Sequence, residues 1–128
     1  MHLKLSDENS IRDALYLIKQ HLQQHYASAT LISEFVTLSS ELCYNAVRHS
    51  GQQTQLDFTL DSNGAELEIR DAGPGFNSLG ERAFVEGFTT SDSLGLGLGA
   101  VVRMSDDFEL ETSHTGTRIK VLKRLSYG

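Results

Sequence analysis

The 128-residue sequence predicts an α+β two-layer sandwich, with helices covering one face of a mixed, mostly antiparallel sheet. Three observations lead to this prediction. Two long segments near the start of the chain repeat apolar residues at helical spacing, and two later pairs of segments alternate apolar and polar residues as strands do. The strands are also grouped apart from the helices along the chain. The length fits one domain over residues 1–128.

The first half of the chain is expected to form one short strand and two helices. His2–Leu5 is the candidate strand, because its leucines would share one face. Ser6 or Asp7 then opens a helix over Asn9–His25, which carries an apolar residue about every third or fourth position. A second helix is predicted over Ala29–Ser50, where the apolar residues again form one stripe.

Two antiparallel hairpins are expected in the second half. Gln55–Asp61 and Ala65–Asp71 alternate and are joined by Ser62–Gly64, whose Asn-Gly pair is a strong turn signal. Asp107–Thr112 and Thr117–Leu122 alternate in the same way. These four runs supply most of the predicted sheet.

Backbone freedom is concentrated between the two hairpins. The chain has 11 glycines, and seven of them lie between Gly73 and Gly99, together with the only proline. Residues 72–94 are therefore expected to be mostly loop, with a short helix near Glu81–Phe84. A third helix, entered through glycines, is predicted over Gly97–Asp106.

Composition and charge exclude several classes of function. The net charge is −6, with 17 acidic and 11 basic residues, which argues against a general nucleic-acid or anionic-membrane surface. The single Cys43 can form neither an internal disulfide nor a cysteine-based metal site. No signal peptide and no membrane-spanning window is visible, so a cytoplasmic setting is expected.

Glu41, Asn45 and His49 follow one another at four-residue intervals, so they share one side of the second helix. A carboxylate there could accept a proton or orient a hydroxyl, and an amide oxygen suits Mg²⁺. Taken alone, polar residues at this spacing more often mark a solvated face.

Asp71 ends a predicted strand on its apolar side and is followed by Gly73 and Gly75. Such a carboxylate could accept hydrogen bonds from a ligand amino group, while the glycines let the backbone lie against a flat ring. The simpler alternative is a strand followed by an ordinary turn.

The glycines of the run from Thr89 to Gly99 enter the third helix and could aim backbone N–H groups at phosphate oxygens. The run matches neither the dinucleotide pattern nor a P-loop, and a flexible hinge is the simpler alternative. Thr117, next to Gly116, would by itself only mark a hairpin turn.

In this order and spacing, the four motifs resemble the GHKL (HATPase_c) family of ATP-binding domains, over about Ser40 to Val121. The resemblance implies the Bergerat-type ATP-binding fold, with ATP and Mg²⁺ as ligands. Residues 87–121 look most like the RsbT-type serine/threonine switch kinases, which are single small domains. Anti-sigma kinases of the RsbW type and the ATP-binding domain of a histidine kinase stay open as alternatives.

The resemblance also implies roles for individual residues. Glu41 would act as the general base or orient the attacking hydroxyl, Asn45 would bind Mg²⁺, and Asp71 would bind the adenine amine. The remaining residues expected to contact the nucleotide are His49, Gly73, Gly75, Thr90, Ser91, Gly95, Leu96, Gly97, Leu98, Gly99 and Thr117.

An RsbT-type kinase would transfer the ATP γ-phosphate to a serine or threonine of a STAS-domain partner protein, a sigma factor or a phosphatase being further candidate partners. Residues 76–94 would form a lid over the phosphates, with Arg82 as its only basic residue. A non-catalytic ATP-gated binding module is the competing class, and Glu41 favours the enzyme because a pure binding module needs no base.

Overall fold

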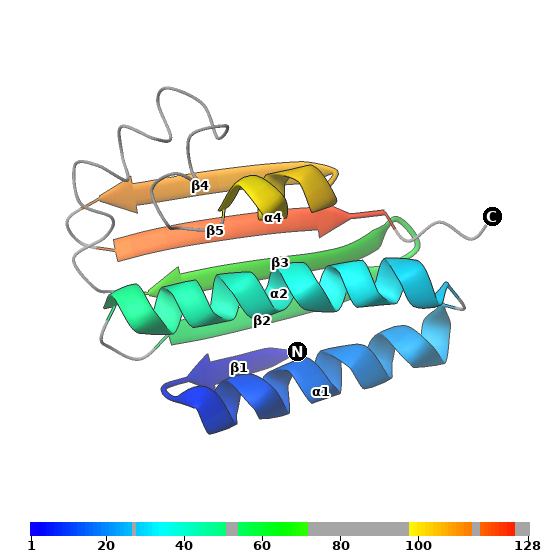
Figure 1. Ribbon diagram of the computed structural model, residues 1–128, viewed down its shortest axis with the longest axis horizontal. Helices are drawn as coiled ribbons and strands as arrows, with labels where there is room; N and C mark the ends of the chain where they lie inside the picture. Colours follow the sequence, from blue (N-terminus) through cyan, green and yellow to red (C-terminus); the bar gives the residue numbers. More distant parts are fainter. Residues whose placement is uncertain (27, 51–53, 72–97, 114–115, 125–128) are drawn as a thin grey trace.

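The computed structural model describes residues 1–26, 28–50, 54–71, 98–113 and 116–124 (Figure 1). In chain order its elements are β1 (His2–Leu5), α1 (Glu8–His25), α2 (Ala29–Ser50), β2 (Thr54–Asp61), β3 (Gly64–Asp71), α4 (Leu98–Met104), β4 (Asp107–Ser113) and β5 (Gly116–Lys123).

The strands form one five-stranded sheet in the order β1-β2-β3-β5-β4, and each neighbouring pair is antiparallel. In Figure 1 the helices α1, α2 and α4 all lie on the near side of this sheet. The predicted α+β sandwich is therefore confirmed. The sheet, expected to be mixed or mostly antiparallel, is antiparallel throughout its described pairs.

Local sequence accounts for both long helices. Helix α1 begins after Asp7, one of the two predicted cap residues, whose carboxylate accepts a hydrogen bond from the Ser10 backbone N–H at 2.8 Å. The Ser10 hydroxyl accepts from the Asp7 backbone N–H at 3.1 Å, which completes a reciprocal cap. Helix α2 has the bounds predicted from its apolar stripe.

Helix α4 ends at Met104, two residues before the predicted end at Asp106. The reason lies in the sheet, because the Asp106 backbone N–H donates to the Leu122 carbonyl of β5 at 2.7 Å. The chain has therefore already turned into the sheet at Asp106. The helix expected near residues 81–84 falls outside the described part of the chain.

The hairpin between β2 and β3 depends on Gly64. Asp61 pairs with Gly64 across a two-residue loop, and the Asp61 carboxylate accepts from the Gly64 backbone N–H at 3.3 Å. Gly64 has a φ of +147°, and a Cβ at this position would collide with the Lys123 carbonyl oxygen. The predicted turn is confirmed, and the glycine also allows β5 to approach closely.

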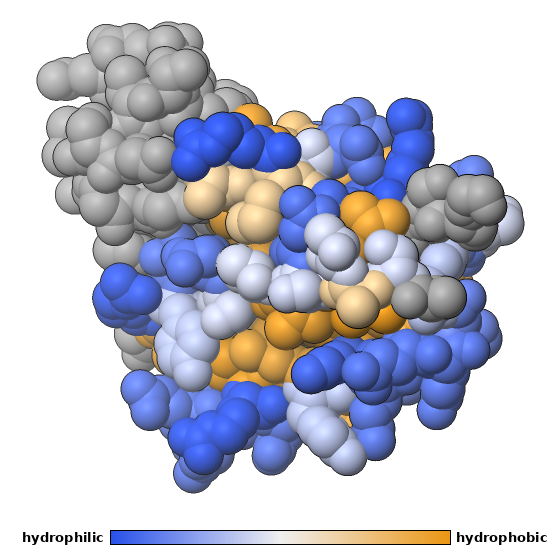
Figure 2. All heavy atoms as spheres, turned by 45° about the vertical axis from the view of Figure 1, so that its right-hand side comes forward, coloured by the Kyte–Doolittle hydropathy of each residue, from blue (hydrophilic) through white to orange (hydrophobic). Residues whose placement is uncertain are grey.

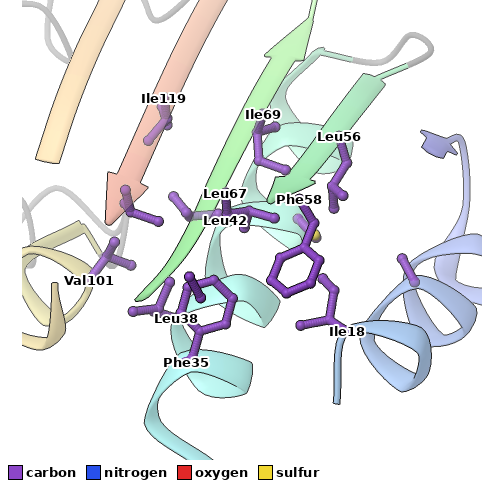
Figure 3. Packing of buried hydrophobic residues seen from close by; sticks show 14 of the residues in the cluster. Ile18, Phe35, Leu38, Leu42, Leu56, Phe58, Leu67, Ile69, Val101 and Ile119 are labelled. Carbon is purple, nitrogen blue, oxygen red and sulfur yellow. The ribbon is translucent and has the colours of Figure 1, made fainter. Parts of the chain in front are cut away.

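The core lies between the sheet and the helices, as Figure 3 shows. Phe35 of α2 packs against Phe58 of β2 with ring centroids 5.8 Å apart. Other buried members shown there are Ile18, Leu38, Leu42, Leu56, Leu67, Ile69, Val101 and Ile119. Burying each such side chain fully contributes about 1.5–3 kcal/mol. None of the helices that the structure describes has the length and hydropathy to cross a membrane.

The opposite face of the sheet carries a ladder of ion pairs. Asp57 on β2 is 2.7 Å from His2 Nδ1 on β1 and 3.0 Å from Arg70 on β3. Partial burial alone would raise the pKa of Asp57, but His2 and Arg70 together hold it below its ordinary value. Arg118 on β5 bonds to Glu68 at 2.8 Å, and this hydrogen bond raises the pKa of the guanidinium. The polar positions of the strands therefore face solvent, and only the helix-covered face is apolar.

Candidate functional site

The helix-covered face of the sheet becomes polar at one end. Thr54 of β2 pairs with Asp71 of β3, and Asp71 pairs in turn with Thr117 of β5. Directly paired residues of antiparallel strands point to the same face, with their Cβ atoms about 4.5–5.5 Å apart. We call Thr54, Asp71 and Thr117 the polar row. Its centre is a carboxylate with a threonine on each side.

The neighbouring row on the same face is entirely aliphatic. Across the sheet it consists of Leu3, Leu56, Ile69, Ile119 and Leu110. In the polar row, Thr54 is 0% and Thr117 6% exposed, and Asp71 is half-buried. Polar groups taken out of water are costly unless they are hydrogen-bonded, so three of them in succession indicate a built polar site.

Helix α2 brings further polar residues to this end of the molecule. In Figure 1 it ends at the side of the sheet where β3 ends and where β2 and β5 begin. Asn45, in its last third, is 4% exposed, whereas Glu41, one turn earlier, is exposed. The backbone of His49 lies in the last turn of α2, and its side chain is outside the description. The two described side chains thus offer a buried amide and an accessible carboxylate.

Helix α4 starts at Leu98, and Gly99 in its first turn is buried. The far end of this helix is held by Lys123, whose Nζ donates to the Met104 carbonyl at 2.7 Å. The same Nζ lies 3.5 Å from Glu34 Oε1 of α2. The Lys123 side chain is only 10% exposed, so it joins α4, α2 and β5 within a largely buried contact.

The structure therefore positions Glu41, Asn45, Asp71, Gly99 and Thr117 among the predicted site residues, and it pairs Asp71 with Thr117 directly. For His49 and Leu98 the structure describes the backbone alone. The remaining predicted residues, together with Arg82 and the expected lid, lie outside the described residues; they are Gly73, Gly75, Thr90, Ser91, Gly95, Leu96 and Gly97.

Thr54 was not among the predicted site residues, because the strand was expected to begin at Gln55. Two signals in the sequence could have found it. Thr54 continues the alternation of Leu56 and Phe58, and counting back from the Asp61–Gly64 pair places it opposite Asp71.

Cys43 lies on α2 but is not suited to be a nucleophile. Burial raises the pKa of its thiol to about 12, so the thiol is protonated at neutral pH.

A hollow of about 600 Å³ between α1 and α2 lies away from the polar row, near the start of α2. It is lined by Lys19, Gln23, Tyr26, Ala29, Ile32, Ser33, Val36 and Thr37. On the side of the molecule drawn in Figure 2, apolar surface forms a band bordered by hydrophilic side chains. The hollow contains none of the predicted site residues, so the polar row is the better candidate for chemistry.

The sequence of this chain is similar to those of known proteins. Residues 5–123 match the family described as the histidine kinase-like ATPase domain. The serine/threonine-protein kinase RsbT of Bacillus subtilis (strain 168) is 32% identical over 97 residues, which cover 73% of this chain and 72% of RsbT.

Solved structures share the fold. The RsbU and RsbW domains of Rv1364c from Mycobacterium tuberculosis superpose with a TM-score of 0.66 at 17% identity, covering all of this chain and 33% of that one. The histidine kinase AdeS of Acinetobacter baumannii gives a TM-score of 0.56 at 16% identity, with 99% and 68% covered. The chain thus spans about a third of the first solved protein and about two thirds of the second.

Proposed function

Because this chain belongs to the histidine kinase-like ATPase domain family, we propose that it is an ATP-dependent serine/threonine kinase acting on a STAS-domain partner protein. The proposal draws on the similarity to RsbT, whose name gives this activity. Its main support in the structure is the polar row, which lies at one end of an otherwise apolar sheet face. The row contains Asp71 and Thr117, the two residues that the family resemblance assigns to the adenine.

The residues of the polar row fit an adenine base. In the proposed site, the Asp71 carboxylate accepts a hydrogen bond from the exocyclic amine, and Thr117 lies beside the ring. The adjacent aliphatic row, which includes Ile69 and Ile119, would pack against the flat base. Gly73 and Gly75 would line the pocket, and the glycines leading to Gly99 would direct N–H groups at the phosphates.

Asn45 and Glu41 are assigned the chemistry at the phosphate end. The Asn45 side-chain oxygen would hold Mg²⁺, an ion that prefers oxygen ligands and, when bound, offsets phosphate charge. Glu41 is exposed and one turn away, so the hydroxyl of a partner protein can reach it. As that hydroxyl oxygen bonds to the γ-phosphorus and ADP leaves, the Glu41 carboxylate accepts the proton.

The test is phosphate transfer from γ-³²P-labelled ATP to purified STAS-domain proteins encoded near this gene. Glu41→Ala should lower the transfer rate by about 100-fold or more, the usual contribution of a general base, while ATP still binds. Glu109→Ala is the matched control, because Glu109 is exposed on the edge strand β4 and lies on the open face of the sheet.

One outcome would reject the kinase activity, and another would reject only the role of Glu41. ATP binding without transfer to any STAS protein would instead favour a non-catalytic ATP-gated module. Transfer by Glu41→Ala at the wild-type rate would leave a kinase but would remove Glu41 from the chemistry.

A further inference from the structure

Asp71 lies between two threonines, and only one of them, Thr117, has been assigned a contact with the nucleotide. We propose that the other, Thr54, is a positioning residue whose hydroxyl holds one oxygen of the Asp71 carboxylate, so that the second oxygen faces the amino group of adenine. This inference rests on the proposed function and adds to it a determinant of base specificity.

The register of the sheet places Thr54 beside Asp71. Thr54 is the direct partner of Asp71 between β2 and β3, and both side chains point to the helix-covered face. With Cβ atoms about 4.5–5.5 Å apart, the threonine oxygen and a carboxylate oxygen are within reach of a charge-assisted hydrogen bond.

The Thr54 side chain is buried among apolar neighbours. Thr54 is 0% exposed, so bulk water does not reach its hydroxyl. Its neighbours along the face are apolar: Leu5 pairs with it from β1, and Leu56 follows it on the same face of β2. Among these neighbours on the sheet face, Asp71 is therefore the residue whose side chain can accept a hydrogen bond from the Thr54 hydroxyl.

A carboxylate that Thr54 holds in one orientation would distinguish adenine from hypoxanthine. Threonine is β-branched and stiff about χ1, so its hydroxyl can fix the direction of a partner. A carboxylate held in this way accepts from the 6-amino group of adenine. Hypoxanthine has a carbonyl at the same place, which would set one acceptor against another and leave the buried site unsatisfied.

The experiment measures Mg²⁺–ATP and Mg²⁺–ITP binding by titration calorimetry for four forms of the full chain. Thr54→Val removes the hydroxyl at nearly constant volume, and Thr54→Ser keeps it. Thr59→Val makes the same change in the same strand on the opposite, exposed face and serves as the control. Thermal unfolding of each variant reports its stability.

We expect Thr54→Val to weaken ATP binding by about tenfold while ITP binding stays nearly unchanged, because only the contact with the amino group depends on the held carboxylate. Thr54→Ser should keep most of the ATP preference, and Thr59→Val should keep all of it. A purely structural role for Thr54 would weaken both nucleotides equally.

Three results would overturn the inference, and they can be told apart. If Thr54→Val retains the wild-type preference for ATP over ITP, or loses affinity for both equally, Thr54 does not position Asp71 and the nucleotide site stands. Should Thr54→Val not fold, loss of the preference in Thr54→Ser at wild-type stability would likewise overturn the positioning role. If the wild-type protein binds no ATP, the proposed function fails and this inference with it.

Discussion

Apart from Lys123, which anchors α4, the buried polar side chains that the structure describes fall into two kinds. Asn45 lies near the end of α2, Thr54 begins β2 and Thr117 follows the first residue of β5, at the end of the sheet where the nucleotide is proposed to bind. Ser39 is different: it is 0% exposed on α2, and its hydroxyl has no hydrogen-bond partner among the described residues. An unsatisfied buried hydroxyl costs about 1–3 kcal/mol of stability, and nothing in the proposed chemistry requires Ser39.

Replacing Ser39 should therefore stabilise the protein. Ser39→Ala is expected to raise the free energy of unfolding by about 1 kcal/mol or more, because it removes the buried oxygen and leaves almost no cavity. Ser33→Ala, at an exposed position of the same helix, measures the part that comes from helix propensity, about 0.5 kcal/mol.

Urea unfolding gives both free energies. A Ser39→Ala variant less stable than wild type would show that the hydroxyl has a partner that stabilises the fold.

Among the elements, α4 is the one whose anchoring most affects the proposed site, since Gly99 lies in its first turn. It has only seven residues, too few for a helix to be stable by itself. Its last turn is held by the hydrogen bond from Lys123 to the Met104 carbonyl and by the ion pair with Glu34. The position of α4 thus depends on a side chain of β5.

Lys123→Met keeps the aliphatic stem but removes both polar contacts of the ammonium group. We expect a loss of about 1–3 kcal/mol in the free energy of unfolding, and faster hydrogen exchange of the α4 amides than of the α1 amides. Lys120→Met, on the open face and 3.7 Å from Glu66, should cost less than about 1 kcal/mol. Equal losses for the two variants would contradict the anchoring role of Lys123.

Elements were predictable from the sequence where local chemistry decides their limits. The periodicity of α1 and α2 and the cap at Asp7 place both helices within a residue. The end of α4 is set instead by the contact between Asp106 and Leu122, which lie in different elements. Strand limits such as Thr54 and Gly64 depend on pairing, so the sequence missed them by one residue.

At the scale of the whole molecule, the candidate site is assembled from distant parts of the chain. The sequence provides Asn45, Asp71 and Thr117 as separate motifs, and the family resemblance groups them. Only the antiparallel register places Asp71 beside Thr117, and the same register adds Thr54, which no motif marks. The residue types were thus predictable, whereas their juxtaposition follows from the topology.

Charge is also distributed at this scale. The protein has a net charge of −6, yet the side chains of Arg70 and Arg118 are bound to carboxylates on the open face of the sheet. These cations lie on the face opposite the helices and are already paired. Neither guanidinium therefore faces the proposed ATP site, where Mg²⁺ and backbone N–H groups would contribute positive field.

The central claim is that the polar row binds the adenine of ATP, and the most direct test is the affinity of Asp71→Asn for Mg²⁺–ATP by calorimetry. The account predicts a loss of about 100-fold, because the site loses its charged acceptor at the amino group. Asp107→Asn, on the exposed start of β4, should bind as the wild type does. An Asp71→Asn variant that is folded and binds ATP with wild-type affinity would contradict the account.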